Sequence, residues 1–306
     1  MLLNSFKLHN CCRSYKHLQS PRYMKFYSSN VETVDLAYNI HDSHNVDPSK
    51  PPLVTFHALL GSGSLWDGVA KEVVKETGRR VINVDARCHG NSPRTESLTY
   101  IETSNDAMKL LRKLEIPKAS VIGHSMGGFT AMGVSLLYPE LVSSLIVVDV
   151  SPVKTRLALS FPMALLKCMA FLPLKSSMTM AEARKLADDS LKTITQDEKL
   201  RIYVISNLYR TDTGEFAWKS YTPTLMNKLE SQIAHFPLYF KGRQYFGPTL
   251  FICGASSEHV AKEDLPGIRE YFPQAEVIFI EGAKHWVQTD KPKEFRETLC
   301  KFLNEK

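Results

Sequence analysis

The sequence is short of several features that mark other protein classes. None of its apolar stretches reaches the ~18 uninterrupted residues needed to span a membrane. Its six cysteines show neither a C-x-x-C pair nor another metal-type spacing, so we interpret the four that follow the first 30 residues as reduced thiols. The GSG at residues 61–63 is too short for a phosphate loop and lacks the lysine of one. These absences argue against a membrane span, a metal centre and a nucleotide site.

Acidic residues are missing from the beginning of the chain, where the first one is Glu32. A basic, serine-containing start without acids is typical of a mitochondrial transit peptide, which we predict over residues 1–28, with the protein in the mitochondrial matrix. A disordered tail without a targeting role is the alternative. The net charge of +6 gives little reason to expect a nucleic-acid partner, because much of it lies in this tail. Five basic residues fall in the first 30 positions: Lys7, Arg13, Lys16, Arg22 and Lys25.

Short, continuously apolar and β-branched runs recur along the chain. Runs of this kind are typical of strands covered on both faces, and helical patterns lie between them. The alternation predicts an α/β fold with a mostly parallel, doubly wound sheet, whose functional residues lie at the carboxyl ends of the strands. The six predicted strands are at residues 52–57, 80–85, 119–124, 143–150, 248–253 and 275–280.

The alternation of strands and helices breaks at residues 151–246. This segment has helical periodicity and no convincing core strand, and the strand pattern resumes after it. We interpret it as a helical cap over the strand ends. The core is then formed by residues 29–150 and 247–306, as one domain with a cap rather than two domains.

The pattern Gly-His-Ser-Met-Gly at residues 123–127 follows a predicted strand and precedes a predicted helix. That context is typical of a nucleophile elbow, in which a serine lies on a strained turn between strand and helix. Ser125 is therefore the candidate nucleophile. An ordinary glycine-rich turn is the structural alternative.

A serine hydroxyl is a poor nucleophile without a base, and in hydrolases of this layout the base comes after the last strand. His285 occupies that position and is the candidate general base. His259, His235 and His89 are the alternatives, although each fits a surface or loop histidine better.

The oxyanion formed during ester cleavage needs two backbone N–H groups directed at it. We expect one from Met126, directly after the candidate nucleophile, and the other from Leu59, in the loop after the strand at 52–57. Hydrolases of this kind usually have His-Gly where this chain has His57 and Ala58. The alanine costs little unless the backbone there requires a positive φ.

The acid that would orient His285 is not at its usual place. The turn after the strand at 248–253 holds Ser257 where an acidic residue is expected, and Glu258 is one position away. Asp149 ends the strand that should lie beside the nucleophile strand, and its apolar surroundings make an unpaired carboxylate costly. We assign the acid to Asp149, with Glu258, a cap residue such as Asp212, or no acid as alternatives.

A number of segments resemble, in order, the α/β-hydrolase domain-containing protein 11 family: FHALLGS, VDARCHGNSP, VIGHSMGG, VDVSP, ARKLAD, GPTLFICG and GAKHW. The resemblance covers about residues 50 to 305. It implies an α/β-hydrolase fold with a helical cap between strands six and seven, and an acid after strand six. It also implies hydrolysis of lipid-like esters, reported as diacylglycerol lipase activity, and an association with mitochondrial lipoyl-dependent enzymes.

These observations predict a serine hydrolase that cleaves carboxylic esters through an acyl-enzyme, with no metal or organic cofactor. A binding protein with a hydrolase fold, or a thioesterase or amidase using the same site, is the alternative. Asp85 and Arg87 are interpreted as an ion pair that shapes a loop beside the site. The cap is rich in apolar residues that suit an acyl chain, with Trp218 as a further wall candidate: Phe161, Met163, Leu165, Met169 and Phe171.

Overall fold

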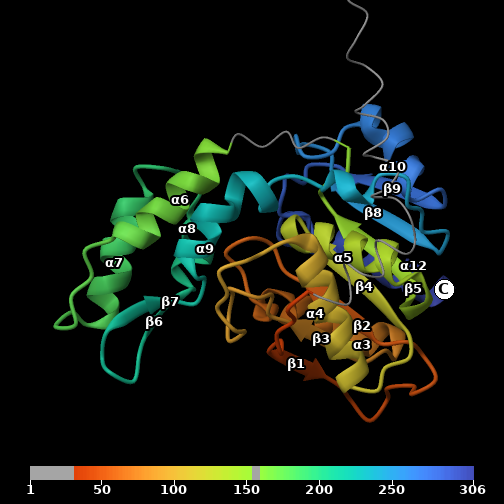
Figure 1. Cartoon of the computed structure of the whole chain (residues 1–306), viewed down its shortest axis with the longest axis horizontal. Coiled ribbons are helices and arrows are strands. Elements are labelled where there is room, and N and C mark those ends of the chain that lie inside the picture. Colours follow the sequence, from red (N-terminus) through yellow and green to blue (C-terminus); the bar gives the residue numbers. More distant parts are fainter. Residues whose placement is uncertain (1–30, 154–158) are drawn as a thin grey trace, which may run out of the picture.

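A computed structural model describes residues 31–153 and 159–306 of the chain. The predicted transit peptide at residues 1–28 lies outside this range. The described chain forms a layered core and a cap that extends from one side of it (Figure 1).

Within the described ranges, seven strands form the main sheet, in the order β1-β3-β2-β4-β5-β8-β9. Of these described strands only β1 is antiparallel to its neighbour, so the predicted mostly parallel α/β sheet is confirmed. The sequence pattern missed β1 because this short edge strand is half-exposed and lacks a continuous apolar run. The strands are β1 (Tyr38–His41), β2 (Leu53–Phe56), β3 (Val81–Val84), β4 (Ala119–His124), β5 (Val142–Val148), β8 (Thr249–Gly254) and β9 (Ala275–Ile280).

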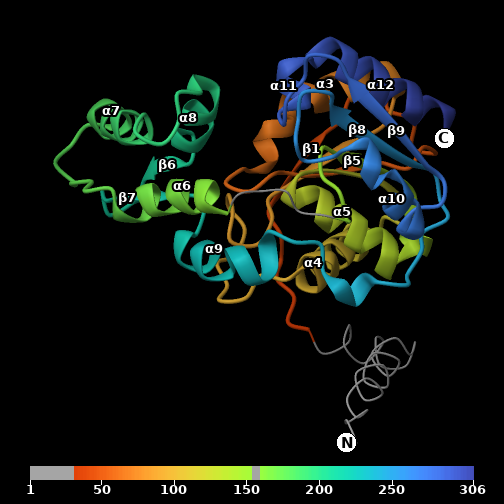
Figure 2. The same cartoon turned by 90° about the horizontal axis from the view of Figure 1, so that it is seen from above.

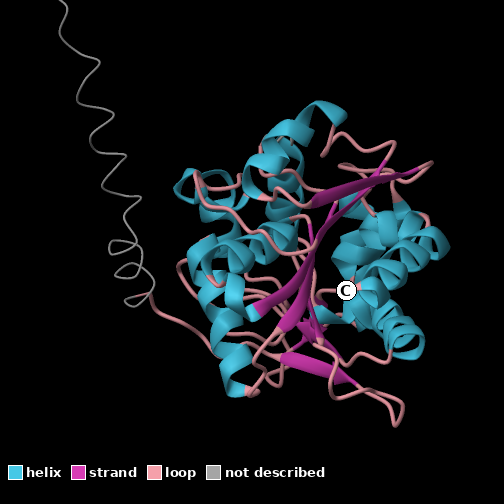
Figure 3. Cartoon of the chain, turned by 90° about the vertical axis from the view of Figure 1, so that its right-hand side faces the viewer, coloured by secondary structure: helices cyan, strands magenta, loops and turns pink. Residues whose placement is uncertain are grey.

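Helices cover both faces of the sheet (Figures 2 and 3). Successive strand residues point to opposite faces, so Val121 of β4 packs in one core and Ile122 in the other. This double burial explains the continuous apolar strands that the sequence shows. One face carries α4 (Tyr100–Lys113), α5 (Met126–Leu137) and α10 (Leu265–Tyr271), and the other carries α3 (Asp67–Thr77), α11 (Val287–Asp290) and α12 (Pro292–Glu305).

The segment between β5 and β8 forms the cap. It begins after the fifth strand of the sheet, counted along the described chain, and it is mainly helical as expected. It also contains a two-stranded antiparallel hairpin, whose three-residue strands are too short to be recognised in the sequence. Its elements are α6 (Ser160–Phe171), α7 (Met180–Leu191), α8 (Glu198–Ile205), β6 (Leu208–Arg210), β7 (Phe216–Trp218) and α9 (Thr222–Lys228).

Short helical turns complete the described chain. They are η1 (Gly63–Trp66), η2 (Pro139–Leu141), η3 (Leu229–Ile233), η4 (Leu238–Phe240) and η5 (Lys262–Asp264). None of the helices in the described ranges is long and apolar enough to cross a membrane.

Candidate active site

Ser125 lies on the sharp turn between β4 and α5. Its backbone has φ 54° and ψ −117°, a strained conformation that side-chain-bearing residues rarely adopt. The glycines on either side allow the turn to pack. A Cβ at Gly123 would lie 2.0 Å from the Gly127 carbonyl oxygen, and one at Gly127 would lie 2.3 Å from the Phe56 carbonyl oxygen. The structure therefore has the elbow geometry that the sequence predicts for this segment.

Asp149 and His285 are brought together although 136 positions separate them. Strand β5 pairs with β4 so that Val148 lies opposite His124, which places Asp149 beside the Ser125 turn. The Asp149 Oδ2 to His285 Nδ1 distance is 2.8 Å, a hydrogen bond in which the imidazole N–H donates. Because Nδ1 carries the proton, His285 Nε2 has a free lone pair.

The Asp149 carboxylate is fully buried, and it accepts hydrogen bonds from the last residue of β8 and from the loop that follows this strand. Its Oδ1 accepts the Gly254 N–H at 3.0 Å, and its Oδ2 accepts the Ser257 hydroxyl at 2.5 Å. Ser257, at the position where an acid was expected, thus supports the acid on the neighbouring strand. Glu258 is exposed, and Asp212 is exposed in the turn between β6 and β7.

Burial sets the protonation states of this pair. It lowers the pKa of His285 to about 4, so the imidazole is neutral at pH 7 and can accept a proton. Burial also raises the pKa of Asp149, while the hydrogen bonds from Ser257 and the Gly254 N–H lower it. The carboxylate is therefore kept in an apolar environment by the donors that surround it.

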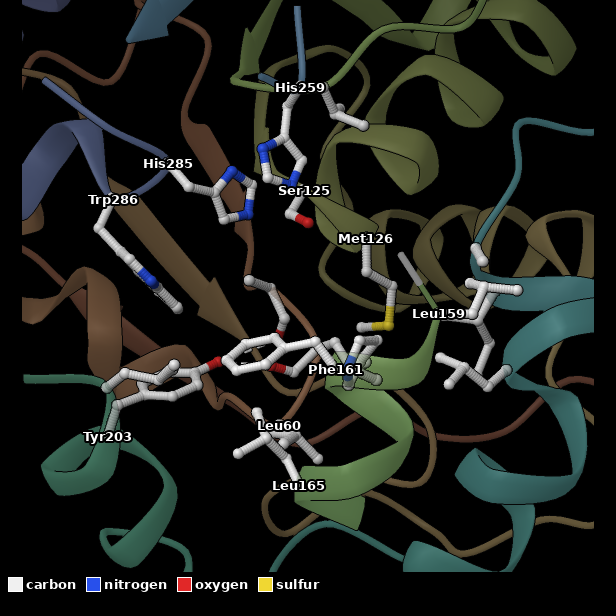
Figure 4. A pocket seen from close by; sticks show the side chains of 18 of the residues that line it. Leu60, Ser125, Met126, Leu159, Phe161, Leu165, Tyr203, His259, His285 and Trp286 are labelled. Carbon is white, nitrogen blue, oxygen red and sulfur yellow. Dashed lines mark hydrogen bonds between the residues drawn. The ribbon is translucent and has the colours of Figure 1, made fainter. Parts of the chain in front are cut away.

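Ser125, His285 and His259 line the wall of one cavity, and Figure 4 shows Ser125 close to the rings of both histidines. Within the described residues no hydrogen bond joins Ser125 Oγ to His285. Catalytic hydrogen bonds are often long before substrate binds, and they tighten in the complex. The structure thus gathers Ser125, His285 and Asp149 in one place.

The loop after β2 presents Leu59 to the same cavity, next to Met126 at the N-terminus of α5. Within the described residues neither backbone N–H has a hydrogen-bond partner. The left-handed residue of this loop is Leu60, with φ 64°, so the alanine at position 58 costs nothing there. The arrangement leaves two N–H groups available to an oxyanion.

Two side chains of the cap region fix this loop. The Tyr203 hydroxyl of α8 donates to the Leu59 carbonyl at 2.6 Å, and Asn207 donates to the Leu60 carbonyl at 2.6 Å. From the core, His89 Nε2 accepts the Leu60 N–H at 3.2 Å. The peptide of Leu59 is thereby held from its carbonyl side.

Comparison with known proteins identifies the family of this chain. The alpha/beta hydrolase fold model matches residues 51–168. The sn-1-specific diacylglycerol lipase ABHD11 of Danio rerio is 38% identical over 270 residues, which cover 88% of this chain and 83% of that protein. Its counterpart in Mus musculus is 36% identical over 276 residues, which cover 90% and 87%. The chain belongs to the α/β-hydrolase domain-containing protein 11 family.

A solved structure agrees with this family assignment. A marine microorganism esterase superposes with a TM-score of 0.77 at 26% identity, over 88% of this chain and 99% of that one. The resemblance seen in the sequence is confirmed, and this family member is a carboxylic ester hydrolase.

The cavity of this hydrolase has a volume of about 360 Å³ and a mainly apolar wall between the core and the cap. Of the cap residues predicted to line it, Phe161 and Leu165 do so, whereas Met169 is buried in the core and Phe171 is 75% exposed. The tryptophan that lines the cavity is Trp286. The predicted wall residue, Trp218, lies in β7 and is not among the lining residues. The apolar lining provides room for an acyl chain.

One group of possible metal ligands occurs in the described residues, formed by Asp149, His259 and His285 with ligand atoms within 4.8 Å of one another. Two ligands of one tetrahedral zinc, at ~2.0–2.1 Å from the ion, would lie roughly 3.3 Å apart. The 2.8 Å contact between Asp149 and His285 is instead a hydrogen-bond distance. We therefore interpret this group as a hydrogen-bonded network.

The predicted ion pair between Asp85 and Arg87 is wrong. Arg87 does not pair with Asp85 but lies buried against Asp106, at 2.7 Å, and Glu102, at 2.9 Å. Asp85 instead accepts the backbone N–H groups of Gly63 and Asn91. Both side chains therefore shape loops beside the site, but through different partners.

The histidines that competed with His285 lie in three environments. His235 is exposed, as expected. His89 is fully buried and supports the loop after β2, so it is not a surface residue. His259 is also misjudged from the sequence, because its ring stacks on His285 with centroids 3.7 Å apart. The only sequence signal for this contact was its place two residues after Ser257.

Proposed function

We propose that this protein hydrolyses lipid-like carboxylic esters, diacylglycerols among them, with Ser125, His285 and Asp149 as its catalytic triad. One observation carries the proposal. The 2.8 Å contact between Asp149 Oδ2 and His285 Nδ1 leaves a neutral imidazole at the cavity wall beside the Ser125 hydroxyl. That is the arrangement a serine needs to become a nucleophile.

The first half of the reaction forms an acyl-enzyme. Ser125 Oγ attacks the ester carbonyl carbon while His285 Nε2 takes the hydroxyl proton. The carbonyl oxygen becomes an oxyanion, which the N–H groups of Leu59 and Met126 stabilise, aided by the N-terminus of α5. The carbon–oxygen bond to the alcohol then breaks, and His285 gives its proton to the leaving oxygen.

The second half releases the acid. Water takes the place of the alcohol, and His285 Nε2 accepts one of its protons as the water oxygen attacks the acyl carbon. The second tetrahedral intermediate collapses, and the proton returns from His285 to Ser125 Oγ. Throughout, Asp149 keeps the Nδ1–H tautomer of His285 and stabilises its positive charge.

The substrate class follows from the cavity and from the relatives. An apolar cavity of about 360 Å³ favours an acyl chain over a polar group. The relatives of Danio rerio and Mus musculus are named as sn-1-specific diacylglycerol lipases, which supports diacylglycerol as a substrate here.

A serine-reactive fluorophosphonate tests the nucleophile, and a diacylglycerol tests the substrate. We expect wild type to be labelled and to release fatty acid, and Ser125→Ala to do neither, with a rate loss of at least about 10³-fold. Ser256→Ala is the matched control, because Ser256 is an exposed serine in the loop after β8. A wild type that is not labelled, or labelling that survives Ser125→Ala, would contradict this enzyme mechanism and leave a binding protein with the hydrolase fold as the alternative.

We also propose a mitochondrial location for this protein, with the lipoyl-dependent enzymes as partners. The acid-free, basic composition of residues 1–28 supports the location. Residues 1–28 fused to a fluorescent protein should direct it to mitochondria, and replacing their five lysines and arginines by glutamine should leave it in the cytosol. Cross-linking the full chain in mitochondria, followed by detection with an antibody against lipoyl groups, tests the partner.

A further inference from the structure

His259 lies at the reaction centre but has no part in the mechanism above. Its ring stacks on that of His285, with centroids 3.7 Å apart and planes at 14°. It comes from the loop after β8 and lines the cavity that contains Ser125. Figure 4 shows the His259 ring next to the Ser125 hydroxyl. The described lining of this cavity thus contains two imidazoles, of which the proposed reaction uses one.

The hydrogen bonds around Ser257 determine where His259 carries its proton. The Asp149 carboxylate only accepts, so the 2.5 Å contact with Ser257 uses the proton of the Ser257 hydroxyl. Ser257 Oγ can then only accept from His259 Nδ1, which lies at 3.2 Å. It follows that His259 has the Nδ1–H tautomer and a lone pair on Nε2.

That lone pair has no partner among the residues that the structure describes. His259 Nε2 is buried, and no described group hydrogen-bonds to it. Burial and the proximity of His285 lower the pKa of His259 to about 4 against the opposing effect of Asp149, so the ring is neutral near pH 7. A buried acceptor without a partner is costly, and its presence at a ligand cavity points to a donor that arrives with the ligand.

We propose that His259 Nε2 accepts a hydrogen bond from a hydroxyl group on the alcohol part of the ester. The proposal rests on the proposed function and deepens it, because it assigns a preference for esters whose alcohol part carries a free hydroxyl. A diacylglycerol has such a hydroxyl, and a triacylglycerol has none. His259 is then a specificity residue, and Ser257 sets its tautomer.

The geometry explains why the alcohol part reaches this nitrogen. The leaving oxygen must lie near His285 Nε2 to receive its proton, and the His259 ring is stacked on His285. A hydroxyl one or two carbons beyond the carbon that carries the leaving oxygen can therefore lie close to the second ring. In a cavity with a mainly apolar wall, a hydroxyl without a partner is disfavoured, and a site built to bind it rejects the analogue that lacks it.

A matched pair of small esters tests the preference on the full chain. The pair is 2-hydroxyethyl butanoate and 2-methoxyethyl butanoate, which share the acyl group and differ in whether the alcohol part can donate a hydrogen bond. Wild type should show a kcat/KM about tenfold higher for the hydroxy ester. A buried water that permanently occupies Nε2 would make the two esters equivalent, and that result would overturn the proposal.

The variant His259→Phe keeps an aromatic ring against His285 and removes the acceptor. The ratio of the two kcat/KM values should fall to about one, and the ratio cancels any loss common to both esters. His235→Phe makes the same change at an exposed histidine outside the cavity and should keep the wild-type ratio. A ratio that stays near ten in His259→Phe would show that another group binds the hydroxyl.

Nitrogen-15 NMR of the histidine side chains in wild type gives a test that needs no variant and no turnover. It should show His259 protonated at Nδ1 and bare at Nε2, and an Nε2–H tautomer would overturn the proposal. A wild type that hydrolyses neither ester would count against the proposed function. In that case the tautomer found by NMR still decides whether His259 Nε2 is an acceptor.

Discussion

The carboxyl ends of β5 and β8 lie side by side, yet they contribute different chemistry to the site. These parallel neighbours are in register from Leu145 opposite Thr249 to Val148 opposite Ile252. Strand β5 is followed by the buried Asp149, whereas β8 leads to a half-buried serine and an exposed glutamate at positions 257 and 258. The comparison shows that an acid can move by one strand and still contact the same histidine, because both ends face one edge of the sheet.

The two strand ends are joined by hydrogen bonds, in which one supplies the acceptor and the other the donors. The end of β5 supplies the acceptor, and the end of β8 with the loop after it supplies the donors, which are the Gly254 N–H and the Ser257 hydroxyl. A buried carboxylate requires such partners, since an unpaired charge in an apolar site is strongly disfavoured. Ser257 is thus a hydrogen-bond donor that stabilises the buried acid at the end of the neighbouring strand.

The largest effect is expected at the end of β5. Asp149→Asn keeps the shape of the side chain but removes the charge that holds the Nδ1–H tautomer of His285. The kcat should fall by about 10³- to 10⁴-fold with little change in KM. Steady-state kinetics on a soluble ester measure this, and a loss below tenfold would remove Asp149 from the triad.

Moving the acid back to β8 tests the comparison directly. In the double variant Asp149→Asn with Ser257→Asp, the new carboxylate is placed where Ser257 Oγ now lies, 2.5 Å from the carboxylate it would replace. It should recover about tenfold in kcat over Asp149→Asn, because it can reach His285 only approximately. Adding Ser256→Asp instead is the control, since that side chain is exposed.

The donor on β8 should matter less than the acceptor on β5. Ser257→Ala removes one of the hydrogen bonds to Asp149, and a hydrogen bond to a charged group contributes about 1.5–3 kcal/mol. Water can replace part of it, so we expect kcat to fall about three- to thirtyfold. A loss as large as that of Asp149→Asn would mean that Ser257 has a direct role in the chemistry.

The pH dependence of activity tests His285, the general base that Asp149 orients. Burial lowers the pKa of His285 to about 4, and the neutral ring is the form that accepts a proton. Activity is therefore lost as pH falls through that pKa and not near 6.5, where a free imidazole titrates. Between pH 7 and pH 5.5, kcat/KM should fall less than about twofold, whereas a base of pKa 6.5 would lose about tenfold.

The difference between the strand ends also marks the limit of what the sequence could predict. Continuous apolar runs identified six strands, and the motif around Ser125 with the loop after β9 identified two site residues, because both signals are local. Asp149 followed from strand adjacency, which the order of β and α units implies. The stacking of His259 on His285 and the bond from Tyr203 to Leu59 depend on side-chain packing between distant loops, for which one sequence contains no periodic signal.

The smallest effect is expected from the residue nearest to the usual position of the acid. Glu258 follows Ser257 directly, but its side chain is exposed, and successive residues of an extended loop point in different directions. Glu258→Gln removes one solvent-screened charge and should change kcat and KM by less than about twofold at 0.15 M salt. If this variant instead lost activity as strongly as Asp149→Asn, the end of β8 would supply the acid after all. Measuring both variants on one ester, at one pH, decides which strand end contains the acid.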